Sequence, residues 1–423
     1  MRGPGRRGNL RSKIRAVITG LGPLAANGVG VANYWRSLVD GRSGIGPITL
    51  FDTSQHDTKI AGEVKSFSLA DYIKPHTNPR KLSRQTQLAL AATKLAMDDA
   101  GLSNGSFKDR AHVPVMIGIS TSSYSMIEAG MQQMMERGPS RVPTFIISGS
   151  QPQQAGSTIA SEFGFSSVVH TFSSACPSGL DAVWAACQWI YSGKGEVALA
   201  GGADAPISPL GMACLDKAGL VTANQADPPR ASRPFSSGTD SGVMSEGSAM
   251  MFVESFEHAM ARGAKMYFEV TGYASCIDPD PNNPASGLTE TMRMALNNAG
   301  RRPEDIDFIC AHGPGHPILD RAETRMIKEV FGAHAYKVPI TSIKGVTGNP
   351  LSAAGPLQLA ACGCAIRNGL IPPTANLETP DALCDLDYVP MRARHCEIDR
   401  ILINTHGLGG GNSSMVVERV TLE

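Results

Sequence analysis

Runs of apolar residues alternate along the chain with longer stretches rich in alanine and polar residues. The apolar, β-branched runs predict strands at Ala16–Thr19, Val113–Ile119, Val168–Phe172, Glu196–Ala200, Met250–Glu254, Ile306–Ala311, Ile401–Asn404 and Ser414–Glu418. The alanine-rich stretches between them, such as Gln85–Ala100 and Leu180–Tyr191, predict helices. Near-continuous apolar strands with helical crossovers predict an α/β fold whose sheets are covered by helices on both faces.

Two pairs of segments resemble each other in the same order along the chain. Ala96–Gly101 resembles Ala295–Gly300, and in both the glycine stands where a helix would end in a left-handed residue. The second pair shares one spacing: Gly179, Ile190 and Gly193 against Gly355, Ile366 and Gly369. Alanine-rich helices can also look alike without duplication. The pattern nevertheless predicts a repeated α/β unit, with a basic tail at 1–15 and two halves at 16–260 and 261–423.

The segment Gly20-Leu-Gly22-Pro-Leu-Ala25 has the outline of a dinucleotide-binding fingerprint, with Asp40 following at about the required distance. That motif needs a helix that begins inside the glycine run, so that its N-terminus meets the pyrophosphate. Here Asn27-Gly28 interrupts the run, and the helical pattern begins only near Val31. We therefore predict a structural turn at this position.

Composition and charge exclude several classes of function. The 423 residues include 38 basic and 38 acidic side chains, so no overall field attracts nucleic acid or an anionic membrane. A hydrophobic content of 42% predicts a large core and excludes global disorder. Few charges and 45 glycines predict close helix packing and a dry interface. No apolar run reaches the ~18–20 residues of a membrane-spanning helix.

The cysteines and the N-terminus bear on the compartment. None of the nine cysteines precedes Cys176 and no CxxC pair occurs, so we expect no disulfide framework or zinc site, as in a reducing cytoplasm. Met1–Arg15 carries six basic residues and no acidic one, including Arg6-Arg7, which allows a twin-arginine export signal as an alternative. Glycine and proline in the following segment favour a basic tail before the first strand.

The strongest candidate for chemistry is Cys176, at a predicted strand-to-helix junction in Thr171–Gly179. Pro177 suits the first position of a helix. Free N–H groups and the helix dipole should stabilise a thiolate there and lower its pKa. The turn is typical of a nucleophile elbow in kind, although not in sequence. The alternative is a buried structural cysteine, which we expect for Cys187 and Cys214.

A cysteine nucleophile needs a group that handles protons and a site for the oxyanion. In the second half, polar residues follow predicted strands as Cys176 does in the first. They are found in Ala311-His312-Gly313, in Ser342-Ile-Lys344 with Gly348-Asn349, and in the glycine loop His406-Gly407-Leu408-Gly409-Gly410-Gly411-Asn412. Taken singly, each could be a satisfied histidine, a surface lysine or a turn.

From about Arg15 to the C-terminus, the chain resembles the elongating, type II β-ketoacyl–acyl-carrier-protein synthases of the thiolase superfamily. The matching motifs are Val17-Ile-Thr-Gly-Leu-Gly22, Gly44-Ile-Gly, Ala175-Cys176-Pro-Ser-Gly179, Gly201-Gly-Ala-Asp204, Ala231-Ser-Arg-Pro-Phe235, Ala261-Arg-Gly-Ala264, Ala311-His312-Gly313, Ser342-Ile-Lys344, Ala353-Ala-Gly355 and Gly407-x-Gly-Gly410. The resemblance implies a thiolase-like, five-layered αβαβα fold of two duplicated halves, usually in a homodimer.

The resemblance also implies roles for individual residues. Cys176 would accept an acyl chain from the phosphopantetheine arm of an acyl carrier protein, with no bound cofactor or metal. The N–H groups of Cys176 and Leu408 would form the oxyanion hole, and Leu408 matches the usual gating Phe. His312 matches the first catalytic histidine, and Lys344 matches the lysine that organises the polar network near it.

Several positions depart from the family pattern. Asn349 replaces the second histidine, although Cys-His-Asn sets serve the initiating synthases and the plant polyketide synthases. Pro314 and His316 replace two threonines that normally bond the pantetheine arm; Pro314 has no donor, and His316 can titrate near neutrality. In the family's usual Phe-Gly-Phe-Gly-Gly motif, His406 and Leu408 replace the two phenylalanines. We therefore expect His316, His406 and Leu408 to shape an altered substrate pocket.

Three functions follow as alternatives. The first is extension of acyl-Cys176 with malonyl-carrier. The second is a specialised ketosynthase that loads Cys176 and then closes a ring or transfers the chain without malonate, as in the cyclising ketosynthase of the salinosporamide pathway; Asn349 and the lost threonines favour it. The third is a non-catalytic, chain-length-factor type partner, against which Cys176 argues. Because carrier proteins are usually acidic, we expect a local basic docking patch that draws on Arg80, Lys81 and Arg84.

Overall fold

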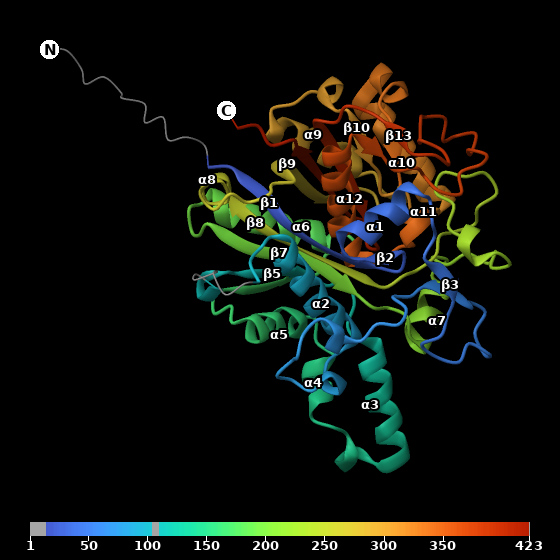
Figure 1. Ribbon diagram of the computed structural model, residues 1–423. Helices are drawn as coiled ribbons and strands as arrows, with labels where there is room; N and C mark the ends of the chain where they lie inside the picture. Colours follow the sequence, from blue (N-terminus) through green and yellow to red (C-terminus); the bar gives the residue numbers. More distant parts are fainter. Residues whose placement is uncertain (1–13, 104–109, 423) are drawn as a thin grey trace.

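The computed structural model describes residues 14–103 and 110–422 (Figure 1). Most of the predicted basic tail, including the Arg6-Arg7 pair, lies outside the described residues. The main sheet is mixed and runs in two similar halves. The first half has the strand order β6 (Val169–Phe172), β5 (Val115–Gly118), β7 (Val197–Asp204), β8 (Gly247–Ser255) and β1 (Ala16–Ala25). The second has the order β11 (Ile340–Thr341), β10 (Phe308–Cys310), β14 (Arg400–His406), β15 (Gly411–Glu418) and β9 (Phe268–Ile277).

The two halves of the sheet share one topology. β5 pairs in parallel with β6 and β7, and β10 pairs in parallel with β11 and β14. The next two pairings in each half are antiparallel. In the first half β8 pairs with β7 and β1, and in the second half β15 pairs with β14 and β9. In the described structure, the two halves of the sheet join where Val17 and Ile18 of β1 pair with Glu269 and Phe268 of β9. This repeat of strand order and direction confirms the predicted duplication, while the exact division between residues 260 and 261 stays a prediction.

Helices form the other three layers around these sheets. The outer layer on the first half contains α2 (Arg84–Asp99) and α5 (Gln153–Phe163), and the outer layer on the second half contains α9 (Leu288–Ala299) and α10 (Pro317–Phe331). The central pair, α6 (Ser178–Tyr191) and α12 (Ala354–Asn368), packs between the two halves (Figure 1). The five-layered αβαβα architecture is therefore confirmed.

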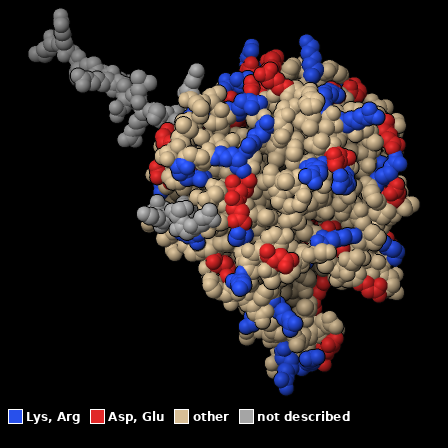
Figure 2. All heavy atoms as spheres, viewed as in Figure 1, with Lys and Arg blue, Asp and Glu red and all other residues tan. Residues whose placement is uncertain are grey.

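Apart from β2 (Gly28–Val29), which pairs with β1, the remaining elements lie outside these five layers, and one of them, α11 (Lys344–Thr347), is entirely buried. They are α1 (Gly30–Val39), β3 (Ile45–Pro47), β4 (Ile60–Gly62), α3 (Tyr124–Arg137), α4 (Phe145–Gly149), α7 (Pro209–Lys217), α8 (Phe256–Ala261), α11 (Lys344–Thr347), β12 (Leu370–Ile371) and β13 (Arg394–His395). On the face seen in Figure 2, acidic and basic side chains are interspersed, as expected for a chain without net charge.

Small residues let the central helices approach each other. A Cβ at Gly179, at the start of α6, would overlap the carbonyl oxygen of Ser352, and a Cβ at Gly355 would lie 3.1 Å from the Leu180 Cβ. Residues 354–366 of α12 are all buried, which is typical of a helix in the middle of a large core. The spacing found in the sequence therefore marks the contact between the two central helices.

All eight predicted strands are present. Three strands of the main sheet, β9, β11 and β2, were not predicted. In β9, buried residues alternate with partly exposed ones instead of forming an apolar run, and β11 and β2 are only two residues long. The predicted turn at Gly20–Ala25 is wrong, because these residues lie within β1. A Cβ at Gly22 would overlap the carbonyl oxygen of Ala92, so the glycine serves the packing of α2 on β1.

The matched glycines end helices as predicted, with φ of +71° at Gly101 and +67° at Gly300. All nine cysteines are free; Cys187 is buried as expected, whereas Cys214 is exposed on α7, so the expectation of a buried Cys214 is wrong. Within the described part of the chain, no helix is both long enough and apolar enough to cross a membrane.

Candidate active site

Cys176 stands in the tight connection between β6 and α6. Ala175, directly before it, has a φ of +62°, a left-handed conformation that is uncommon for alanine. The Ser178 N–H donates to the Ala175 carbonyl at 3.0 Å, which closes the turn. Pro177 is the N-cap of α6 and Ser178 its first residue, one position later than predicted. The thiol is thus held at a helix N-terminus by a strained turn, as in a nucleophile elbow.

The prediction of a lowered thiol pKa is wrong. Burial raises the pKa of Cys176 to about 11, while the positive charge of Lys344 and a hydrogen bond from the Asn349 side chain act in the opposite direction. The cause is the buried position of the side chain, which lies among apolar residues of the core. Sequence alone placed Cys176 at a helix end but could not show that water is excluded there.

His312 and Lys344 form one buried unit at the ends of β10 and β11. The Lys344 Nζ donates to the His312 carbonyl oxygen at 2.5 Å and lies 3.4 Å from His312 Nδ1. Lys344 is only 1% exposed. Burial and the adjacent Lys344 charge lower the pKa of His312 well below its usual range, so the imidazole is neutral at physiological pH.

A carboxylate that the sequence reading missed fixes the backbone below this histidine. Glu323 of α10 accepts hydrogen bonds from the N–H groups of His312 at 2.9 Å and of Gly313 at 2.8 Å. It also accepts one from the Asn404 amide at 3.2 Å. Glu323 is 1% exposed, and its burial raises its pKa. The sequence feature that could have pointed to Glu323 is the presence of an acidic residue on the apolar face of an amphipathic helix.

Asn349 follows α11 and is anchored through its backbone. Its N–H donates to the Val243 carbonyl at 2.8 Å, and its carbonyl accepts from the Ser245 N–H at 3.0 Å. The side chain is buried and acts to lower the pKa of Cys176, whereas its Oδ1 is buried without a partner among the described residues. An unpartnered amide oxygen next to a thiol is available for a substrate group.

The glycine loop after β14 approaches the nucleophile closely. A Cβ on Gly407 would lie 2.8 Å from the Cys176 N and 2.7 Å from the Ala175 Cβ, so glycine is required for this contact. Within the described residues, neither the Cys176 N–H nor the Leu408 N–H donates a hydrogen bond to another residue. Two backbone donors, one on each of two adjoining segments, are therefore free to hold a negatively charged oxygen.

The predicted residues surround one cavity of about 590 Å³. Cys176, His312, His316, Asn349, His406 and Leu408 all line it. Lys344 lies beneath His312 and is not part of the wall. Apolar side chains such as Met244, Ile277, Ile318 and Leu351 form much of the remainder. Ile277 and Leu408 are 69% and 59% exposed, so the cavity opens through an apolar mouth suited to an acyl chain.

His316 is the N-cap of α10 and lines the cavity near Pro314. Its Nδ1 is buried without a partner among the described residues, and burial lowers the pKa of the ring. Below the same loop, Asp320 accepts hydrogen bonds from the N–H groups of Phe235 at 2.7 Å and of Gly315 at 3.2 Å. Burial raises the pKa of Asp320 to about 8. The loop that carries the two replaced threonine positions is therefore rigidly held from below.

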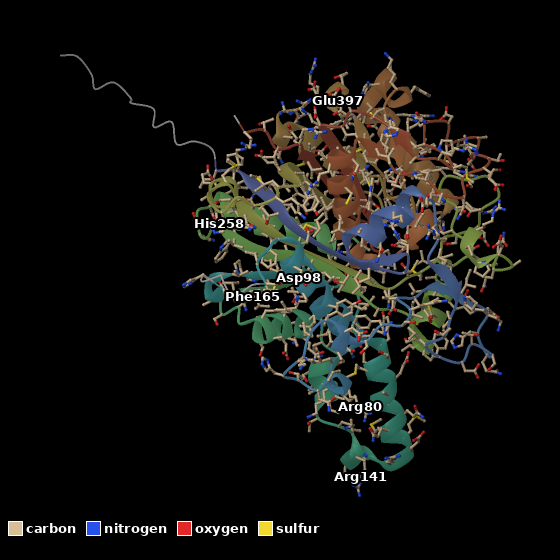
Figure 3. The ribbon with its side chains drawn as sticks, viewed as in Figure 1. Arg80, Asp98, Arg141, Phe165, His258 and Glu397 are labelled. Atoms are coloured by element: carbon tan, nitrogen blue, oxygen red, sulfur yellow. The ribbon has the colours of Figure 1, made fainter. Side chains whose placement is uncertain are left out.

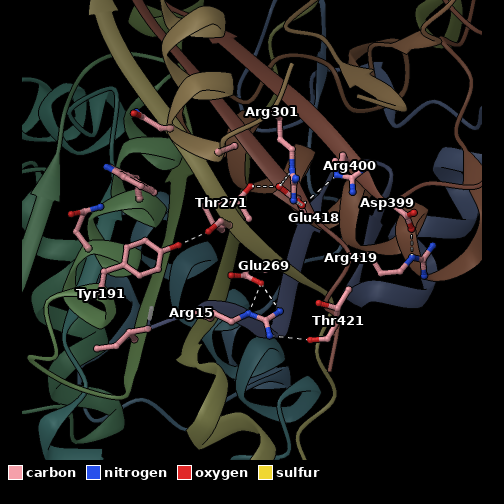
Figure 4. A pocket seen from close by; sticks show the side chains of 16 residues that line it. Arg15, Tyr191, Glu269, Thr271, Arg301, Asp399, Arg400, Glu418, Arg419 and Thr421 are labelled. Carbon is pink, nitrogen blue, oxygen red and sulfur yellow. Dashed lines mark hydrogen bonds and ion pairs between the residues drawn. The ribbon is translucent and has the colours of Figure 1, made fainter. Parts of the chain in front are cut away.

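No three His, Cys, Asp or Glu side chains within 14–103 and 110–422 are grouped in a way that could hold a metal ion. A second hollow, of about 760 Å³, lies elsewhere and is lined by Arg15, Glu269, Arg301, Arg400, Glu418, Asp399 and Arg419 among others (Figure 4). Its charges are paired with one another: Glu269 with Arg15, Glu418 with Arg301 and Arg400, and Asp399 with Arg419. Among the described residues, each charged side chain that lines this hollow therefore has an oppositely charged partner.

The predicted basic patch is only partly available. Arg84 binds both carboxylate oxygens of Glu246 at 2.6 Å, so it is not a free cation and that part of the expectation is wrong. Arg80 and Lys81 are exposed, and among the described residues their side chains form no ion pair. Figure 3 labels Arg80 near the projection formed by α3 and α4, with Arg141 at its end.

Two family descriptions match the chain: "Beta-ketoacyl synthase, N-terminal domain" over residues 14–259 and "Beta-ketoacyl synthase, C-terminal domain" over 267–378. Among curated proteins, the tetracenomycin polyketide synthase ketoacyl synthase alpha subunit of Streptomyces glaucescens is 37% identical, covering 96% of this chain and 97% of its own. The 3-oxoacyl-[acyl-carrier-protein] synthase 2 of Coxiella burnetii is 36% identical, covering 96% and 99%.

A solved structure described as a type II PKS acyl-carrier protein in complex with its ketosynthase bound to the hexaketide superposes with a TM-score of 0.87 at 30% identity. The match covers 97% of this chain and 100% of that chain. Sequence and fold therefore agree over nearly the whole length.

Proposed function

The chain belongs to the β-ketoacyl synthase family of condensing enzymes, and from that premise we propose that it is a ketosynthase-like acyltransferase of polyketide-type metabolism. We propose further that it loads an acyl chain on Cys176 and then forms a carbon–carbon bond within that chain, without malonate. The observation that carries the first proposal is the convergence of Cys176, His312, Asn349 and two free backbone N–H groups on one apolar cavity.

Loading exchanges one thioester for another. The Cys176 Sγ attacks the carbonyl of the carrier thioester, and the N–H groups of Cys176 and Leu408 stabilise the oxygen that becomes negative. When the tetrahedral intermediate collapses, the pantetheine sulfur leaves, and the proton from Cys176 ends on that sulfur. Burial raises the pKa of Cys176 to about 11, so the resting thiol is protonated and its proton is transferred in the course of loading.

The residues around the pantetheine path favour a reaction other than extension. Extension requires a second, malonyl-bearing carrier arm to be held while carbon dioxide leaves. Pro314 has no N–H or hydroxyl to donate, and the partly buried His316 takes the place of a small hydroxyl group. A chain that reacts with itself needs an arm only for loading and no second arm for the bond-forming step, so the loss of these two threonines impairs it less than it impairs extension.

The test follows the chain by intact-protein mass spectrometry. With an acyl-carrier thioester, the enzyme should gain the acyl mass, and Cys176→Ala should not. With malonyl-carrier added, little carbon dioxide should be released. Absence of acylation would contradict the loading step, whereas robust, turnover-linked decarboxylation would support extension instead. The non-catalytic alternative predicts neither acylation nor turnover, even with the intact Cys176.

A second measurement separates loading from the later step. His312 is neutral and lies beside the cavity, so we propose that it acts after acylation rather than during it. His312→Ala should still acquire the acyl mass on Cys176 and should then release no product. Unimpaired turnover of this variant would remove His312 from the mechanism.

We propose that an acyl carrier protein docks on the basic residues near α3 and α4. One similar structure is described as an acyl-carrier protein in complex with its ketosynthase. Arg80, labelled in Figure 3, and Lys81 are exposed cations in the turn Pro79–Lys81, which contacts α4. Reversal of both charges to Glu should raise the KM for the carrier thioester with little change in acylation by a small thioester, while reversal of the distant Arg42 should leave both unchanged.

We propose that the protein is a homodimer. β6 is the last strand on one side of the sheet in the described structure, and its residues are only partly buried. A second copy could pair along this edge and so continue the sheet. Size-exclusion chromatography with light scattering should give twice the chain mass, and a monomer at micromolar concentration would contradict this.

A further inference from the structure

His406 occupies the position where the family motif carries phenylalanine, and it is the last residue of β14. Its side chain is 6% exposed and lines the same cavity as Cys176 and His312. The rings of His406 and His312 lie with centroids 6.0 Å apart and at 83° to each other. A phenylalanine here could only shape the wall, whereas an imidazole can also carry a proton.

The hydrogen bonds around His406 determine which ring nitrogen carries that proton. Its Nδ1 lies 2.9 Å from the Asn412 Oδ1. The Asn412 Nδ2 donates at 2.8 Å to both the Asp278 Oδ1 and the Gly410 carbonyl oxygen, which are acceptors. The amide orientation is thereby fixed, with its oxygen toward the histidine. His406 Nδ1 must therefore donate, and in the neutral ring the lone pair is on Nε2.

Asp278 is itself held firmly in place. It accepts hydrogen bonds from the backbone N–H groups of Ala285 at 2.9 Å and Gly287 at 2.8 Å. A Cβ on Gly287 would lie 2.5 Å from the Asn412 Nδ2, so the segment also packs tightly on the amide. The chain Asp278–Asn412–His406 therefore orients the ring, as a carboxylate orients a catalytic histidine.

The Nε2 atom of His406 is free for a ligand. No described residue offers it a hydrogen-bond partner, and the ring lines the cavity. His312 has the opposite arrangement. The Lys344 ammonium group can only donate, so His312 Nδ1 next to it must accept, which leaves the proton of the neutral ring on Nε2. The cavity thus contains one imidazole with a free lone pair and one with a free N–H.

We propose that His406 is the general base of the carbon–carbon bond-forming step, with His312 as the hydrogen-bond donor. This inference rests on the proposed loading of Cys176. His406 Nε2 removes a proton from C2 of the acyl chain on Cys176, and the electron pair of that C–H bond forms an enolate whose oxygen accepts from His312 Nε2–H. The substrate class is an acyl thioester that carries a ketone farther along the same chain.

The remaining bonds balance without a further reactant. The enolate carbon bonds to the ketone carbon, and the carbonyl π pair becomes an alkoxide. The alkoxide then takes back the proton from His406, so the base is regenerated. One C–H bond is broken, and one C–C and one O–H bond are formed, with no oxidant and no loss of carbon dioxide. The product is a β-hydroxy thioester within a ring.

The experiment uses full-length enzyme acylated from the carrier thioester of 6-oxoheptanoate, in D₂O. C2 and the C6 ketone of this chain can close a five-membered carbocycle. Acylation is followed by intact-protein mass spectrometry, ring closure by loss of ketone reactivity toward hydroxylamine, and deuterium at C2 by NMR after release. The variants are His406→Phe, which restores the usual residue, and His406→Gln, which retains a hydrogen-bonding side chain without basicity.

We expect both variants still to acquire the acyl mass, but to exchange C2 and close the ring, once acylated, at least ~100-fold more slowly than acylated wild type. Asn412→Leu, which removes the acceptor for Nδ1, should still be acylated and, once acylated, should show an intermediate loss of exchange and ring closure, as expected for a positioning residue. Exchange that persists in His406→Phe, or wild-type enzyme that loads but neither exchanges nor cyclises, would overturn the inference. If wild type does not load at all, the proposed function itself fails, and that outcome is distinct.

Discussion

Replacement of Gly407 by alanine should specifically damage acyl transfer. The new Cβ would lie 2.8 Å from the Cys176 N, 2.7 Å from the Ala175 Cβ and 2.8 Å from the Pro177 Cδ. All three atoms belong to the turn that holds the nucleophile, and two of them are backbone or ring atoms that cannot rotate away. The methyl group would also cover the Cys176 N–H, one of the two donors proposed for the oxyanion.

Two effects set the size of the loss. Ordinary van der Waals contact needs roughly 3.4–4.0 Å between such atoms, so the loop must retreat by more than half an ångström. Loss of one oxyanion donor costs roughly 10²–10³ in rate, or about 3–4 kcal/mol in the barrier. Overpacking costs about 1–3 kcal/mol in the free energy of unfolding, which a protein of this size can tolerate. We therefore expect a folded protein that is acylated at least ~100-fold more slowly.

The assay measures the rate of Cys176 acylation by quenched-flow mass spectrometry, together with thermal unfolding. Gly409→Ala is the matched control: it lies in the same loop with a φ of +84°, but a Cβ there meets nothing within 4 Å. It should cost about 1 kcal/mol in backbone strain and leave acylation within a few-fold of wild type. Equal acylation rates for Gly407→Ala and wild type, at an unchanged Tm, would refute the reasoning.

Three further predictions concern buried titratable groups. Alkylation of Cys176 by iodoacetamide should rise about tenfold for each pH unit between about pH 7 and 10, because its pKa is about 11, and Lys344→Met should slow it further; a plateau near neutral pH would contradict this. Glu323→Gln places an amide NH₂ against the N–H of His312 or Gly313, so one of these donors loses its acceptor. The free energy of unfolding in urea should fall by about 1–3 kcal/mol, and an unchanged urea midpoint would contradict this prediction. The Asp320 pKa of about 8 in the folded protein exceeds its value in the unfolded chain, so its contribution to stability is complete below about pH 4 and is lost as the pH rises to about 8. Urea midpoints measured across that range should fall more steeply for wild type than for Asp320→Asn, and parallel curves would contradict the assignment.

The sequence by itself determined the architecture and the outline of the site. Apolar runs marked eight strands, because strands buried on both faces leave a nearly continuous hydrophobic signal. The repeated glycine spacing predicted a duplicated unit, and the structure shows that the two matched helices are the central pair, whose close contact tolerates no Cβ at Gly179 and little at Gly355. Cys176, His312 and the glycine loop were found because each follows a strand of the sheet. Asn349, which follows α11, was singled out by the family resemblance.

Only the tertiary structure decided the electrostatics and the direction of each polar atom. Burial reversed the expected pKa shift of Cys176, and solvent exclusion is a property of residues far apart in sequence. No local sequence motif marks Glu323 or Asp278, because the backbone N–H groups that donate hydrogen bonds to them are brought into place by folding. The tautomer of His406 likewise depends on Asn412 and Asp278, which are 6 and 128 residues away along the chain and meet only at the cavity.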